Sequence, residues 1–270
     1  MRWAVVAVLL ASGCRATLPV ADSGLAAELF PKDSVRLARP AVGLCLDGDG
    51  ILVLEASGTR ILRLGEALAP AETIPLATRL IGPQGICSDR HYFYIYDSNT
   101  LYRMARDKLV LSAWMGNVRV VGMASYAPAE VLVADANRGA IWYKGFFGDS
   151  RQFVSPGTVR RPGAMVTLGD AGYCVVSDRR ELVLLNRLGM VVRSRPAPEG
   201  TDLLAADSSG HVWLGRTGVA EVNRLDVRVA GNRSQQSYRL AGASSPTQIA
   251  AGSRLAVLDA ADRVLVYDLP

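Results

Sequence analysis

The stretch VLVADANRGAIWYKG, residues 131–145, consists of an apolar run, an acidic residue, a short polar turn and a second apolar run. Two apolar, β-branched runs on either side of a polar turn predict a β-hairpin. Five other stretches have the same form: residues 51–64, 93–104, 173–186, 212–225 and 255–269. The hairpin is therefore a unit that occurs six times in the chain.

The six hairpins recur with a regular period. The residues that open their turns are Glu55, Asp97, Asp135, Asp178, Gly215 and Asp259. Successive turns are 37 to 44 residues apart, and further short apolar stretches flank the hairpins. Four short strands in a unit of about 40 residues are typical of a β-propeller blade. The sequence thus predicts an all-β fold, a six-bladed β-propeller over residues 34–270.

A similarity between the two ends of the chain predicts how the ring closes. SVRLA at residues 34–38 resembles SYRLA at residues 237–241, which has the position of a fourth, outer strand. The sixth hairpin is followed by no such strand. We expect residues 34–38 to complete blade six, because an incomplete blade would expose unpaired backbone groups along its edge.

Two of the units carry a more specific signature. PQGICSDRHYFYIYDSNTLYRM, residues 83–104, and residues 131–145 resemble the NHL repeat of six-bladed propellers, which has Pro-x-Gly before the innermost strand and Asp with Asn-Arg at the turn. The resemblance implies the fold. It does not imply one activity, because this architecture occurs in lyases, lactonases, nucleic-acid binders and scaffolds.

The first residues are typical of a secretory leader. Arg2 precedes an apolar run over residues 3–11 that is too short to span a bilayer. LASGC, ending at Cys14, resembles the lipobox of bacterial lipoproteins, which implies that Cys14 receives lipid. The alternative is an ordinary signal peptide cut nearby. We expect an exported, periplasmic or outer-membrane-associated lipoprotein.

The leader and the repeats together predict three segments. Residues 1–13 are the signal peptide, residues 14–33 are a lipid-anchor tether with one short helix near residues 25–29, and residues 34–270 are the propeller.

Arginines recur in the turns between second and third strands and in the loops before innermost strands. These two sets of loops lie on one face of a propeller, so they predict a basic ring around the channel mouth that binds phosphate, carboxylate or sulfate groups. The candidate ligand-binding residues are Arg39, Arg60, Arg138, Arg160, Arg161, Arg179, Arg180, Arg216 and Arg263. The alternative is that these arginines pair with the acidic residues of the same turns.

Three cysteines follow Cys14. Cys45 and Cys87 are each the third residue of a predicted innermost strand, where a small apolar residue packs between blades. A disulfide between them is the alternative. Cys174 is expected in the core, and the alternating Tyr92, Tyr94 and Tyr96 are interpreted as packing residues.

The expected function is that of a non-catalytic binding or scaffold propeller in a cell-envelope assembly. The expected partner is an envelope protein or an anionic envelope polymer, with the membrane reached through lipid on Cys14. Nucleic acid is not expected, since aromatic residues are not concentrated in the loops.

The alternative function is a metal-dependent lactonase-like hydrolase or a lyase acting at the central channel. The chain has only two histidines, His91 and His211. The positions that face the channel in lactonase-like propellers are Val42, Gln84, Val121, Pro162, Thr201 and Thr247. These side chains are a poor ligand set for a hard cation, so we predict no catalytic residues, no metal and no cofactor.

Overall fold

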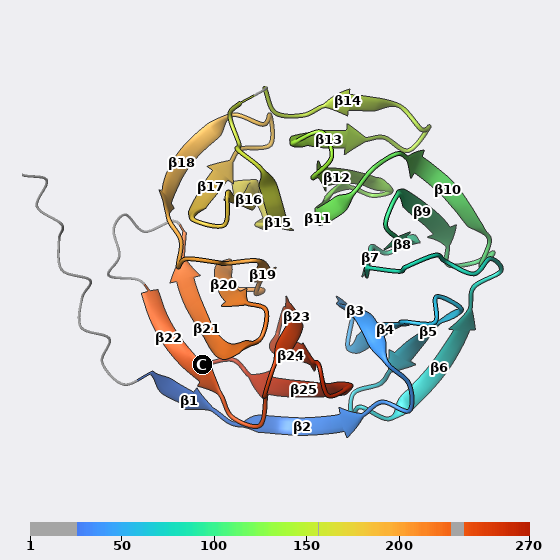
Figure 1. The fold of residues 1–270 in the computed structure, drawn as a ribbon, viewed down its shortest axis with the longest axis vertical. Helices are drawn as coiled ribbons and strands as arrows, with labels where there is room; N and C mark the ends of the chain where they lie inside the picture. The colour runs from blue at the N-terminus through green and yellow to red at the C-terminus, as the bar shows by residue number, and fades with distance from the viewer. Residues whose placement is uncertain (1–25, 156, 228–234) are drawn as a thin grey trace, which may run out of the picture.

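A computed structural model describes residues 26–155, 157–227 and 235–270 of the chain. It contains six β-sheets arranged around a central channel (Figure 1). The predicted six-bladed β-propeller is confirmed. The leader, Cys14 and most of the expected tether lie outside the described residues.

The strands of each blade run outward from the channel in chain order. In blades one to three they are β3 (Ala41–Asp47), β4 (Gly50–Glu55), β5 (Arg60–Leu64), β6 (Pro70–Pro75), β7 (Gly85–Ser88), β8 (Tyr92–Tyr96), β9 (Thr100–Ala105), β10 (Leu111–Gly116), β11 (Val120–Ala127), β12 (Glu130–Asp135), β13 (Ala140–Lys144) and β14 (Ser150–Gln152).

Blades four to six continue in the same way, with one 3₁₀ turn, η1 (Gly169–Ala171), in blade four. Their strands are β15 (Pro162–Thr167), β16 (Tyr173–Ser177), β17 (Glu181–Leu185), β18 (Val191–Pro196), β19 (Leu203–Ala206), β20 (His211–Arg216), β21 (Val219–Asp226), β22 (Gln235–Leu240), β23 (Pro246–Ala251), β24 (Arg254–Asp259) and β25 (Arg263–Asp268).

An N-terminal strand completes blade six, as the similarity between the chain ends predicts. Strand β2 (Pro31–Arg36) pairs antiparallel with β25, with Ser34 opposite Leu265. The next residue along, Leu37, is buried, and its N–H donates to the carbonyl oxygen of Asp262 at 2.8 Å. The first described strands therefore hold the last blade in the ring.

The segment before β2 differs from the expectation. Strand β1 (Ala27–Leu29) pairs in parallel with β22, the outer strand of blade five, with Ala27 opposite Tyr238. Strands thus begin before the expected boundary at residue 34, and the predicted short helix is wrong over Ala27–Leu29. The outer edge of β22 offers unpaired backbone groups, and these override the weak local preference of Ala-Glu-Leu for a helix.

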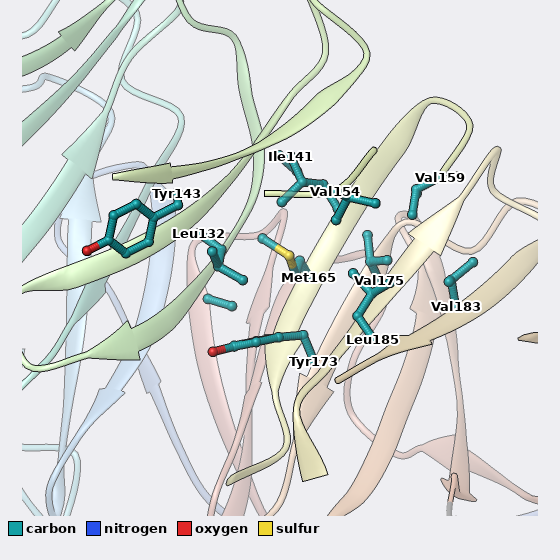
Figure 2. Packing of buried hydrophobic residues seen from close by; sticks show 12 residues of the cluster. Leu132, Ile141, Tyr143, Val154, Val159, Met165, Tyr173, Val175, Val183 and Leu185 are labelled. Carbon is teal, nitrogen blue, oxygen red and sulfur yellow. The ribbon is translucent and has the colours of Figure 1, made fainter. Parts of the chain in front are cut away.

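The hydrophobic core lies between adjacent blades. Between blades three and four, Leu132 and Ile141 pack with Met165 and Val175 (Figure 2). Each fully buried side chain of this size contributes about 1.5 to 3 kcal/mol to folding. The described residues form one such cluster at each of the six junctions between neighbouring blades.

The three cysteines in the described part of the chain, Cys45, Cys87 and Cys174, are free thiols. Cys45 and Cys174 are buried, and burial raises the pKa of each thiol to about 12. The disulfide alternative for Cys45 and Cys87 is not observed, and Cys174 lies in the core as predicted.

The described residues include no helix long and apolar enough to cross a membrane.

Candidate functional site: the channel mouth

All nine predicted arginines lie on one face of the propeller. Antiparallel neighbours place the turn between second and third strands on the same face as the loop into the next blade. We call this the arginine face. Most of these arginines lie in such turns or loops, and Arg60, Arg216 and Arg263 lie at strand ends beside the turns.

In blades one, three and six the arginines pair with buried acids. The distances are 2.7 Å for Arg60 to Glu55, 3.0 Å for Arg138 to Asp135 and 2.6 Å for Arg263 to Asp259. Arg39 is also 4.0 Å from Glu55, and the three acid side chains are at most 6% exposed. These four arginines therefore pair with acidic residues of the turns, which was the alternative to ligand binding.

The buried acids also fix the backbone of their turns. Asp135 Oδ1 accepts hydrogen bonds from the N–H groups of Arg119 and Asn137 at 3.1 and 3.0 Å. Burial alone would raise the pKa of Asp259, but hydrogen bonds from Arg263 and from the segment at Ser244 outweigh it and lower the pKa below its usual value. Each acid thus joins a turn to the loop that enters its own blade.

Blade four has a serine in place of this buried acid. Ser177 Oγ accepts from the N–H of Arg160 at 3.1 Å, as Asp135 accepts from Arg119 in blade three. Asp178, predicted to open the turn as the equivalent of Asp135, is instead displaced into the turn and exposed. In blade five Leu203 pairs with Gly215 as Gly85 pairs with Tyr96 in blade two, so Arg216, one residue after the predicted Gly215, stands where blade two has its buried Asp97. Neither blade has a buried carboxylate to neutralise its arginines.

The arginines of blades four and five are consequently exposed. Arg161 lies 3.5 Å from Asp178, Arg179 lies 3.8 Å from Asp202, and both arginine side chains are more than 70% exposed. Exposed pairs of this kind contribute about 0 to 1 kcal/mol. We call Arg160, Arg161, Arg179, Arg180 and Arg216 the arginine sector.

The other members of the sector are also accessible. Arg180 reaches Glu199 at 3.2 Å, with both side chains exposed. In the described part of the chain, the exposed side chains of Arg160 and Arg216 have no ion-pair partner. These charges are free to meet a ligand at little cost.

The backbone of the sector is strained. Asp178 and Arg179 have φ values of 49° and 58°, and Arg180 N–H donates to the Ser177 carbonyl oxygen at 3.1 Å, which closes a two-residue hairpin turn. Such turns favour Asn-Gly, because other residues pay about 1 to 2 kcal/mol in this region. Arg161 has a φ of 43°. Strain of this kind concentrates at binding sites, where it holds side chains in place.

The sector borders a cavity of about 460 Å³ at the mouth of the channel. Arg161, Arg179, Asp178 and Asp202 line it. Five of the six channel positions predicted from the repeat also line it: Gln84, Val121, Pro162, Thr201 and Thr247. Asp202 Oδ1 is held by the N–H and the hydroxyl of Thr217, at 2.7 and 3.2 Å.

The cavity continues into the central channel. A second cavity of about 350 Å³ shares the wall residues Tyr96, Val121, Ala164, Asp202, Leu203 and Gln248 with the first. Tyr96 packs against the core between blades two and three, as predicted, and it also lines both cavities. Tyr96 pairs across the sheet with Gly85, which has no side chain and leaves space for the tyrosine ring. This tyrosine–glycine pair is the sequence signal that could have placed Tyr96 at the channel.

The two histidines lie elsewhere. His91 and His211 follow innermost strands, on the face opposite the arginines, and neither lines the two channel cavities. His211 Nδ1 is 3.1 Å from the guanidinium of Arg224. Within residues 26–155, 157–227 and 235–270, no three His, Cys, Asp or Glu side chains are grouped closely enough to hold a metal ion.

Comparison with known proteins identifies the fold and no family. No protein-family model and no curated protein sequence matches the chain. A streptogramin B lyase structure matches with a TM-score of 0.62 at 12% identity, covering 88% of this chain and 87% of the lyase. Virginiamycin B lyase from Staphylococcus aureus gives 0.61 at 15% identity, covering 84% and 80%. The WD40 propeller domain of Doa1 gives 0.63 at 13% identity, covering 84% and 78%.

Proposed function

We propose that the protein is a non-catalytic binding propeller that holds an anionic group of its partner at the arginine sector. One observation carries this proposal: in the two blades that lack the buried turn acid, no arginine pairs with a buried carboxylate, and two of these arginines, Arg161 and Arg179, line the channel mouth. Guanidinium groups bind carboxylate and phosphate in a forked geometry. The basic ring predicted from the sequence is thus reduced to one sector.

The proposal places the propeller in the cell envelope. The leader and the LASGC stretch support export and lipid attachment at Cys14. A lipid anchor would keep the domain at a membrane, since each buried methylene contributes about 0.8 kcal/mol. The partner is an envelope protein or an anionic envelope polymer.

The second candidate function is a lyase or hydrolase acting at the channel, favoured by the fold that the chain shares with the streptogramin B and virginiamycin B lyases. A further matching structure is a catalytically inactive histidine-to-alanine variant of virginiamycin B lyase with quinupristin. Here the carboxylates lining the mouth cavity are Asp178 and Asp202, each beside an arginine. This donor set does not fit a hard cation, which takes six to eight oxygen ligands.

The test compares two charge-neutralised proteins. Arg161→Gln with Arg179→Gln removes the cations that line the cavity, whereas Arg138→Gln removes one that pairs with a buried acid. Calorimetric titration with citrate and with inorganic phosphate should show at least tenfold weaker binding for the double variant and unchanged binding for Arg138→Gln. Equal affinities in all three proteins would overturn the proposal. Stoichiometric calcium or zinc in the purified protein would instead favour the lyase or hydrolase.

A further inference from the structure

The wall of the channel is made of unpaired strand edges. Strands β3, β7, β11, β15, β19 and β23 each lie at the inner edge of their sheet (Figure 1). An edge strand presents N–H and C=O groups without partners in its own sheet. Residues of all six strands line the channel cavity, so these groups alternate as donors and acceptors around it. Backbone amides of a peptide have the matching pattern.

One side chain in the channel has an unused hydrogen-bonding group. The Tyr96 hydroxyl makes no hydrogen bond with any described residue. It lies beside Gly85, 2.1 Å from the point that a Cβ on this glycine would occupy. Burial raises the pKa of the Tyr96 phenol, and the nearby thiols of Cys87 and Cys45 raise it further, so the hydroxyl stays protonated. It is an accessible donor that lies between the two cavities.

The charges at the mouth favour a single anionic group over a polyanion. Two arginines line the mouth cavity, and Asp178 and Asp202 line it with them. A chain of phosphates or sulfates would meet these carboxylates as well as the guanidiniums. A single terminal carboxylate can lie at Arg161 and Arg179 while the uncharged remainder of the ligand extends into the channel, away from these charged residues.

We propose that the channel binds a peptide by its C-terminal end. The terminal carboxylate lies at Arg161 and Arg179, and the residues before it extend into the channel past Tyr96, whose hydroxyl donates to a peptide carbonyl oxygen. The amide side chains of Gln84 and Gln248, which line the mouth cavity, and the inner strand edges hydrogen-bond the peptide backbone. Side chains that fit are small or apolar, because Val121, Ala164 and Leu203 form the shared wall.

This inference rests on the proposed anion site and adds the class of ligand. Capture of a C-terminal carboxylate together with strand-edge hydrogen bonds is a recurring mode of peptide recognition. It makes the envelope partner a protein whose chain ends freely in solution.

The experiment uses the full chain in detergent and two matched probe libraries. N-acetylated tetrapeptides built from Ala, Val, Leu, Ser and Gly are prepared as free acids and as C-terminal amides, and bound peptides are measured by affinity selection and mass spectrometry. We expect selected free acids to bind at least tenfold more tightly than their amides. Arg161→Gln with Arg179→Gln should abolish this preference, and Tyr96→Phe should weaken the acids about threefold or more with an unchanged melting temperature.

The controls separate the two proposals. Arg138→Gln should bind the acids as the natural chain does. Acetate and inorganic phosphate, titrated in parallel, report the anion site alone. If they bind and depend on Arg161 and Arg179 while free acids and amides bind equally or not at all, the peptide inference is wrong and the anion site stands. If none of the probes depends on these arginines, both are wrong.

Discussion

Replacing the strained turn of blade four should stabilise the protein and weaken its binding at the same time. The change is Asp178→Asn with Arg179→Gly, which installs the Asn-Gly pair favoured for a two-residue hairpin. Both residues have positive φ values, 49° and 58°. Relief at Arg179 is worth about 1 to 2 kcal/mol. Asparagine at position 178 tolerates the left-handed region slightly better than aspartate does, which adds a few tenths of a kcal/mol to the free energy of unfolding.

Two costs reduce this gain. Glycine increases the entropy of the unfolded chain by about 0.4 to 1 kcal/mol. Loss of the Arg179–Asp202 contact, 3.8 Å long and exposed at the arginine, costs about 0.5 kcal/mol. At the midpoints of these ranges the net gain is about 0.5 kcal/mol, or a rise of about 1 to 2 °C in melting temperature for a domain of this size. Affinity for the anionic probe should fall about tenfold, since a charge-assisted hydrogen bond contributes about 1.5 kcal/mol or more.

Urea unfolding measures the first effect and calorimetric titration the second. A higher midpoint with an unchanged dependence on urea indicates a true stability gain. Arg138→Gln is the control: it should lose about 1 to 2 kcal/mol, because Asp135 is fully buried, and should keep its affinity. A double variant that is less stable than the natural chain would refute the strain reasoning. A more stable variant with full affinity would remove Arg179 from the site.

Three further changes test the fold around the site. Deleting residues 26–40 removes β1 and β2, and should lower the urea midpoint of the whole domain in one transition instead of melting blade six alone. The lowered pKa of Asp259 contributes stability above about pH 4 that is lost as the pH falls through the folded-state pKa; Asp259→Asn should therefore flatten the loss of stability measured between pH 5 and pH 3. Cys45 and Cys174, with pKa values near 12, should resist iodoacetamide at pH 8 in the folded protein and react once urea unfolds it, as peptide mapping would show.

The ring and its closure could be predicted from sequence because both appear as repeated sequence patterns. Six apolar hairpins at one spacing indicate the blades, and the similarity of residues 34–38 to residues 237–241 indicates the missing outer strand. Strand β1 has no such repeated pattern. Its three residues form a strand because the edge of β22 accepts them, and that edge exists only after blade five has folded.

The site was only partly predictable. The arginines are visible as a repeated residue type, but their environments depend on a shift of one position between Ser177 and Asp178. An alignment of the repeats by their acidic residues matches Asp178 to Asp135 and hides this shift. In the structure Asp178 belongs to a two-residue turn with positive φ values and lies beyond the end of the strand, where Ser177 takes the place of the buried acid. The packing of Tyr96 was predictable, but its position at the channel was not. Strand alternation indicates which face of the sheet a side chain is on, whereas the space beside Gly85 allows the Tyr96 hydroxyl to reach the channel.

The closure of blade six also sets the timing of folding. Val35 pairs with Val264, so strand β2 waits for a partner synthesised 229 residues later. Contacts of such long sequence separation form slowly, and unpaired edges remain open to aggregation in the meantime. The chain therefore cannot reach its native state while it is still being synthesised. We expect it to depend on a chaperone that shields these edges until the last strand emerges.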